Sequence, residues 1–219
     1  MEFEEIAAGC DEVDLSRLAP SVGTYALCDV KKREADTYIF FSYADGRRSW
    51  TALYDDAVKD YTVHVSFPLF YFVDIDFIRR DREAFMECVN AEYMRAVEDT
   101  LVHPQRGFTH AYRMSGLPER DVSKSMPERI GELTRGIDPQ TAIRGINGSY
   151  VIGEYALPDE RTGLLFFYNT FRKVFFAERV VNGLRTVIHE FDATGTEEFE
   201  DRLLEHLRDM SEGFGRQHG

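Results

Sequence analysis

The sequence predicts an α+β protein built mainly of antiparallel β-meanders, each followed by an amphipathic helix packed on one face of its sheet. Three observations support this fold class. Short β-rich segments recur in both halves, turn dipeptides separate them at Asp45-Gly46 and Asn182-Gly183, and an apolar stripe with helical spacing follows each set of strands. Two similar halves could be repeats, or could share a common pattern by coincidence.

We divide the chain of 219 residues into three parts on this basis. Residues 1–101 form an N-terminal meander plus helix, residues 102–140 an irregular connector, and residues 141–219 a C-terminal meander plus helix. A chain of this length fits one large domain or two small ones, so the two halves could also pack as one domain.

In the first half, the residues before the long helix predict one short helix and four strands. The helix covers about Asp14–Ala19 and ends at Pro20. Asp45-Gly46 predicts a two-residue type I′ turn, which needs positive φ at both central residues. The expected strands are Thr24–Val30, Thr37–Ala44, Ser49–Tyr54 and Tyr61–Val73.

The last of these strands changes character along its length. Its early part alternates apolar and polar residues, which predicts one buried face. Pro68 has no N–H to donate, so we expect a bulge or a sheet edge there. Beyond Pro68 the run is apolar on both faces, and we expect both faces to be covered.

The long helix of the first half covers about Arg80–Leu101. Its apolar residues recur every four positions, which places them on one face. Cys88 lies beside this stripe and is expected in the core. The stripe consists of Phe85, Val89, Tyr93, Val97 and Leu101.

Residues 102–140 are interrupted by several prolines and glycines, which is typical of a connector or a functional loop. Phe108–Met114 is expected to form a short strand. Ser125-Met126-Pro127-Glu128 resembles a capping box that opens a helix of a few turns.

The second half predicts four strands and a final helix. Thr194 and Glu197 have the spacing of a capping box at the start of that helix. Its buried stripe is Phe199, Leu203, Leu207 and Met210. The expected strands are Tyr150–Leu157, Gly163–Tyr168, Lys173–Val181 and Leu184–Phe191.

Composition narrows the function classes. Hydrophobic residues make up 43% of the chain, which is enough for a core. The net charge of −13 disfavours binding to a nucleic-acid backbone and suits docking to a basic protein or self-association. The sequence has no apolar run of about 18 residues, so we expect no membrane contact.

The cysteines and the N-terminus predict a cytoplasmic location. Cys10, Cys28 and Cys88 are odd in number and widely spaced, which favours free thiols in a reducing compartment. The first residues are acidic where a signal peptide would be basic. The sequence also lacks the glycine-rich phosphate loops, the nucleophile elbow and the zinc motifs, and we expect no cofactor.

Asp74 and Asp76 are the first candidate site. Two residues apart at a strand end, they point to the same side and could share a divalent metal ion. Alternatively, one carboxylate caps the following helix and the other faces solvent, which is the more common arrangement at such junctions.

The connector supplies a second candidate, His103, Arg106, His110 and Arg113. Together these cations could bind an anionic group, because arginine donates bidentate hydrogen bonds to carboxylates and phosphates. The alternative is that they are ordinary polar residues on a surface loop.

Aromatic residues are concentrated in Phe67–Phe72 and Phe166–Phe176, where consecutive apolar residues must bury both faces of a strand. We expect an intramolecular core or an interface. The leading hypothesis is a non-catalytic cytoplasmic protein-interaction module, such as an adaptor, a chaperone-like binder or an immunity-type acidic binder. The alternative is an enzyme, for example a metal-dependent one, that uses Asp74 and Asp76 or the connector cations.

Overall fold

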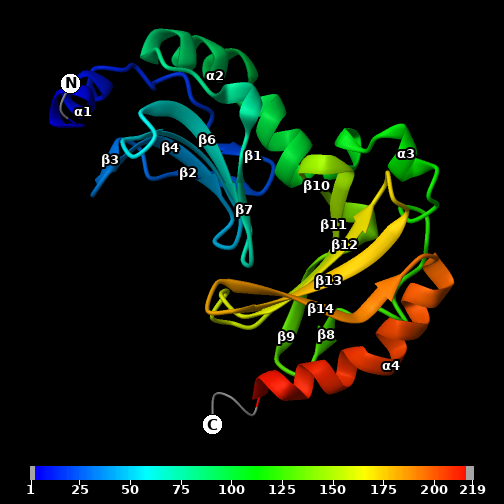
Figure 1. Cartoon of the computed structure of the whole chain (residues 1–219). Helices are drawn as coiled ribbons and strands as arrows, with labels where there is room; N and C mark the ends of the chain where they lie inside the picture. The colour runs from blue at the N-terminus through cyan, green and yellow to red at the C-terminus, as the bar shows by residue number, and fades with distance from the viewer. Residues whose placement is uncertain (1–2, 216–219) are drawn as a thin grey trace. The chain divides into compact units, whose positions relative to one another are not determined.

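The computed structural model describes residues 3–215, and the chain divides into two compact units, residues 1–102 and 103–219. Each unit holds a seven-stranded antiparallel sheet, and a long helix follows the last strand of each (Figure 1). The fold is therefore α+β, as the strand and helix patterns predict.

The first unit has the strand order β1-β2-β4-β5-β6-β7, with β3 paired to β4. Its long helix is α2, which continues as a π turn, η2. The elements are α1 (Phe3–Asp11), β1 (Ser21–Val22), β2 (Tyr25–Cys28), β3 (Lys32–Glu34), β4 (Thr37–Ala44), β5 (Ser49–Asp55), β6 (Asp60–Ser66), β7 (Tyr71–Val73), η1 (Ile75–Phe77), α2 (Arg82–Val97) and η2 (Glu98–Val102).

The second unit has the strand order β8-β9-β11-β12-β13-β14, with β10 paired to β11. Residues expected to form a connector supply its first elements. The elements are η3 (Pro104–Gly107), α3 (His110–Arg113), β8 (Arg129–Ile130), β9 (Leu133–Ile137), η4 (Pro139–Thr141), β10 (Ile143–Arg144), η5 (Ile146–Gly148), β11 (Ser149–Ala156), β12 (Gly163–Asn169), β13 (Val174–Val181), β14 (Leu184–Ala193) and α4 (Thr196–Gly215).

The two units share one topology, strand for strand. Strands β1 to β7 correspond in order to β8 to β14, including the side pairing of β3 and β10. The register matches as well: Tyr38 lies opposite Tyr54 in the first unit, and Tyr150 lies opposite Tyr168 in the second. The halves are therefore two copies of one strand arrangement, although few residues are identical.

The helices keep the same relationship to their sheets. The Phe85 ring of α2 lies 5.8 Å from that of Tyr61, and the Phe199 ring of α4 lies 4.5 Å from that of Phe175. The number of residues between the two partners is the same in both pairs. From β5 through α2, and from β12 through α4, the two units thus align without a gap.

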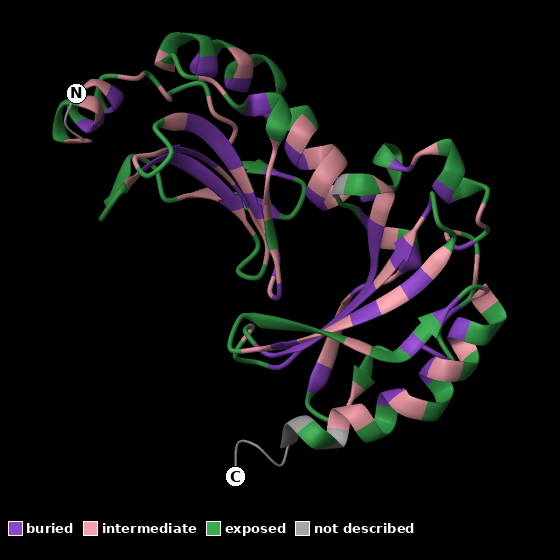
Figure 2. Ribbon diagram, viewed as in Figure 1, coloured by how far each residue is buried: buried purple, intermediate pink, exposed green. Residues whose placement is uncertain are grey.

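The predicted helical stripes are confirmed as core. Eight of the nine stripe residues are buried, whereas Met210 is only half-buried, and α4 shows both buried and exposed positions (Figure 2). Burial of each such side chain contributes about 1.5–3 kcal/mol relative to exposure. The buried stripe residues are Phe85, Val89, Tyr93, Val97, Leu101, Phe199, Leu203 and Leu207. Cys88, in contrast, is only half-buried, so its assignment to the core is wrong.

The predicted strand Tyr61–Val73 is two strands. β6 and β7 pair antiparallel, and the chain reverses between Phe67 and Phe70, where the Phe67 N–H donates to the Phe70 carbonyl at 2.8 Å. Pro68 thus lies in a turn, at the place that Asn182 holds in the second unit. β7 is an edge strand and its Tyr71 is 67% exposed, so the expectation that both faces are covered is wrong.

The two turn dipeptides behave differently. Asn182 and Gly183 both have positive φ and lie between the paired residues Val181 and Leu184, which confirms a two-residue type I′ turn. At Asp45-Gly46 the hairpin is confirmed but the turn type is wrong, because only the glycine has positive φ. The Asp45 carboxylate instead accepts the N–H groups of the two residues after the glycine.

Four local predictions are wrong. Residues 14–19 form no helix, and the helix of this region is α1. Phe108–Met114 contains α3 in place of a strand, because the Thr109 hydroxyl accepts the Tyr112 N–H and caps a helical turn. Residues 125–128 are not helical and lead into β8. Helix α4 begins later than expected, and Glu198, in place of Glu197, accepts the Thr194 N–H at 3.0 Å.

Candidate binding groove on the second unit

A groove of about 610 Å³ lies in the second unit, between helix α4 and the segment that leads into and through β8. Its size is in the range of ligand-binding sites, about 300–1,000 Å³. The lining residues are Lys124, Ser125, Pro127, Arg129, Ile130, Gly131, Leu203, Leu204, Leu207, Arg208 and Ser211. We refer to these residues as the α4 groove.

The floor of the α4 groove is apolar. Leu203 and Leu207 belong to the buried stripe of α4 and face the core, whereas Leu204 is 53% exposed. Ile130, from β8, is half-buried and packs against the same core cluster. With Leu204, the apolar face of α4 is therefore wider than the part that packs on the sheet, and it extends into the groove.

The rim of the groove is basic. Lys124, Arg129 and Arg208 are all exposed. Among the side chains that the structure describes, no ion pair joins any of these three cations to a carboxylate. In a chain of net charge −13, three cations around one hollow form a local field of opposite sign.

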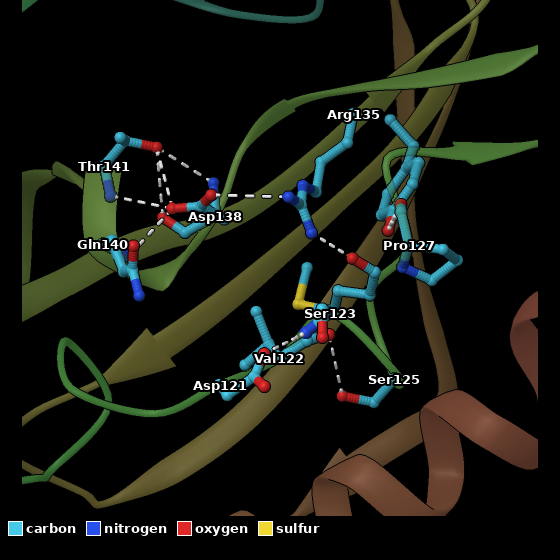
Figure 3. Close-up of polar contacts among 11 residues, drawn as sticks. Asp121, Val122, Ser123, Ser125, Pro127, Arg135, Asp138, Gln140 and Thr141 are labelled. Atoms are coloured by element: carbon cyan, nitrogen blue, oxygen red, sulfur yellow. Dashed lines mark hydrogen bonds and ion pairs between the residues drawn. The ribbon is translucent and has the colours of Figure 1, made fainter.

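Hydrogen bonds hold the wall opposite α4 in place (Figure 3). The half-buried Arg135 guanidinium donates to the Met126 carbonyl and lies 3.6 Å from the carboxylate of Asp138. The Tyr155 hydroxyl donates to the Pro127 carbonyl at 2.7 Å. The wall is thus fixed to β9 and β11, which pre-organises the groove before any ligand binds.

A bidentate ion pair fixes the preceding loop to α4. Arg120 donates to the two carboxylate oxygens of Glu200 at 2.6 and 2.8 Å. This carboxylate raises the pKa of Arg120, which remains charged at any physiological pH. Both sides of the groove are therefore anchored to the same helix and sheet.

In the first unit, a tyrosine closes the corresponding place. Tyr93 holds the position of Leu207, its ring stacks on Tyr43 at 5.7 Å, and its hydroxyl accepts the Ala19 N–H at 3.1 Å. The hollow there measures about 220 Å³. Pro127 stands where the first unit has Ala19, and proline has no N–H to donate. The second unit therefore has neither the ring nor the donor that closes the first.

The basic rim is also specific to the second unit. Met94 holds the position of Arg208 in the helix alignment. Ser21 and Arg129 begin the first strand of their units in the same register, so Ser16 and Ser21 hold the positions of Lys124 and Arg129. The first unit thus has a smaller hollow at this place, whose lining includes one acid and one base, Asp14 and Arg17, whereas all the charged residues that line the larger hollow of the second unit are basic.

Asp74 and Asp76 lie at a different place, in the first unit. Asp74 caps η1, its carboxylate accepting the Asp76 N–H at 3.2 Å, while Asp76 is exposed. Burial, with a contribution from the nearby Asp76 charge, raises the pKa of Asp74. The two border a hollow of about 420 Å³ shared with Glu92, Arg95 and Asp99. Within residues 3–215, no three His, Cys, Asp or Glu side chains are grouped to hold a metal ion.

The connector cations lie on two short helical turns. Arg106 is in η3, His103 precedes it, and His110 and Arg113 are one turn apart in α3. Arg113 donates to the carbonyls of Phe108 and Gln105 at 3.2 and 2.9 Å, and its guanidinium lies 5.8 Å from the Phe108 ring centre. Arg113 therefore stabilises the local backbone, while His110 is exposed.

Sequence reasoning missed the α4 groove. The sequence offered one signal: an apolar residue, Leu204, and a cation, Arg208, lie outside the buried stripe of α4, on its otherwise acidic face. The sequence predicts a helix that opens at Ser125, directly after Lys124 and with Arg129 inside it, so the position of these two cations opposite α4 could not be deduced.

Comparison with known proteins does not assign this chain to a family. No protein-family model, no curated protein and no solved structure matches this chain. None of the helices in the described part of the chain is long and apolar enough to cross a membrane.

Proposed function

We propose that this chain is a non-catalytic protein-interaction module of the cytoplasm that holds a partner protein in the α4 groove. The observation that carries the proposal is the open, basic-rimmed groove in the second unit, at a place that the first unit closes with Tyr93. An exposed apolar side chain, Leu204, at the centre of a polar rim is typical of a protein-binding surface.

The chemistry of the lining favours binding over catalysis. The lining residues include two serines but no His, Asp, Glu or Cys. Ser125 and Ser211 donate their hydroxyl groups to the carbonyls of Val122 and Arg208. A serine nucleophile needs an adjacent general base, and the lining holds neither a histidine nor a carboxylate for that role.

A site-specific photo-crosslinker at position 204 tests the proposal. We expect one discrete protein adduct in host cells, whose crosslinked peptide mass spectrometry assigns to a single segment of a single partner. The matched control carries the crosslinker at Leu184, which is 77% exposed and lies at the start of β14. Equal labelling of many proteins at both positions, or no adduct at position 204, would contradict the proposal.

A second candidate function uses Asp74. Its raised pKa and its place in a hollow beside Asp76 favour an enzymatic acid or a divalent-metal ligand. Calorimetric titration of the chain with Mg²⁺ or Mn²⁺ tests the metal version. Binding that Asp76→Asn abolishes and Asp192→Asn preserves would support it. If no binding heat is measured at millimolar metal concentration, the metal-binding hypothesis is contradicted.

A further inference from the structure

We infer that the occupant of the α4 groove is a short amphipathic helix of a partner protein, with an apolar face and flanking carboxylates. This inference rests on the proposed function and names the chemistry of its partner. Three features of the groove support it: the length of its floor, the position of its charges and its open rim.

The length of the floor fits two helical turns. Along α4 the lining runs from Leu203 to Ser211, which corresponds to about 12 Å at a rise of about 1.5 Å per residue. An amphipathic helix of the same length presents apolar side chains at spacings of three and four residues. Two such side chains can contact Leu204 and Ile130 together.

The charges select an acidic ligand. Lys124 and Arg129 are on one wall and Arg208 on the other, so carboxylates on both flanks of a bound helix would each meet a cation. Hydrogen bonds between charged groups contribute more to binding than neutral ones. The chain as a whole has a net charge of −13, whereas the charged residues that line the groove are all cations. At short range these cations disfavour the binding of basic helices.

The open rim favours a protein segment over an enclosed small molecule. All three rim cations and Leu204 are exposed, so the groove covers only one side of an occupant. Small-molecule sites usually enclose most of their ligand. A helix that belongs to a larger partner needs only one covered face.

Fluorescence anisotropy with designed helical peptides and the full chain tests this inference. Three labelled peptides of equal length carry the same apolar positions with glutamate flanks, the same positions with lysine flanks, or a scrambled order with glutamate. We expect saturable binding of the first peptide alone. Arg208→Glu should weaken that binding about tenfold, as loss of one charge-assisted contact implies. Arg172→Glu is the control of equal charge change, because Arg172 is exposed in the β12–β13 turn.

Several outcomes would overturn the inference: equal binding of the lysine peptide, no binding of the glutamate peptide, or equal weakening by Arg208→Glu and Arg172→Glu. Laurate provides the small-molecule arm. If laurate binds with a stoichiometry of one, depends on Arg208, and the glutamate peptide does not bind, the occupant is an amphipathic small anion. If position 204 gives a specific protein adduct but the glutamate peptide does not bind, the proposed interaction function is supported and only the acidic-helix inference is contradicted.

Discussion

The hydroxyl of Tyr155 donates to the carbonyl of Pro127 at 2.7 Å, and this bond joins the centre of the second sheet to the wall of the α4 groove. The first unit repeats the contact, with Tyr43 donating to the carbonyl of Ala19 at 2.8 Å. A tyrosine on the fourth strand of each unit thus holds the segment that precedes the first strand. What differs between the units is the helix residue that packs beside it.

Removing this hydroxyl should destabilise the second unit. Tyr155→Phe leaves the ring in place and the Pro127 carbonyl without its donor, which should lower the free energy of unfolding by about 1 kcal/mol or more. Urea unfolding followed by circular dichroism measures the change. Tyr71→Phe, on an exposed tyrosine of β7, serves as the control and should have no effect. An unchanged stability in Tyr155→Phe would show that the contact has no energetic role.

The first unit suggests how to close the groove. Leu207→Tyr combined with Pro127→Ala recreates the pair of Tyr93 and Ala19, in which a ring fills the space and a backbone N–H meets its hydroxyl. We expect loss of glutamate-peptide binding and a stability above that of Leu207→Tyr alone, where the hydroxyl lacks the donor. Leu207→Met should keep the binding, because it nearly preserves volume. Full binding by the double variant would contradict the role assigned to the groove.

Glycine at position 183 is required by its backbone conformation. Its φ is +81°, and a Cβ there would meet no atom within 4 Å, so Gly183→Ala should cost about 1 kcal/mol through strain alone. Gly195→Ala is the matched control, because that glycine also has open space but no positive φ. Thermal unfolding of both variants measures the difference. Equal melting temperatures would mean that the turn tolerates a side chain.

The stripe of α4 should dominate the stability of its unit. Phe199 is 2% exposed and contacts the rings of Phe166 and Phe175, so Phe199→Ala should cost about 3–5 kcal/mol. Phe171, which is 78% exposed, provides a control with the same chemical change, and Phe171→Ala should alter the stability by less than about 0.5 kcal/mol. Chemical denaturation gives both values, and similar costs would refute the assignment of the core.

Alkaline pH should destabilise the first unit. Burial, with a smaller effect of the nearby Cys10, raises the pKa of Tyr61 to about 12 from an ordinary value of about 10. As the pH rises, the unfolded chain loses the tyrosine proton before the folded chain does. The contribution of Tyr61 to the free energy of unfolding is therefore fully present below about pH 10 and is lost as the pH rises towards 12. Urea titrations across this window, with tyrosinate absorbance, measure the loss. Constant stability from pH 9 to pH 12 would contradict the expectation.

Local sequence patterns predict the strands, turns and helices that recur in both units. Val89, Phe199 and Leu203 were assigned to the core because helical spacing places them on one face, and this spacing does not depend on distant residues. The Asn182-Gly183 turn was predictable for the same reason, since its two residues set their own φ. Local periodicity and local backbone preference thus gave the α+β class and both long helices.

The α4 groove and the likeness of the two units depend on contacts between residues far apart in the sequence. Arg129 faces Arg208 because β8 is paired into a sheet that α4 covers, and no local pattern encodes a contact across so many residues. Likewise, Leu207 and Tyr93 are equivalent only through strand register, since the surrounding residues differ. Side chains that meet across a sheet are brought together by chain topology and core packing, which a single sequence expresses too weakly to read.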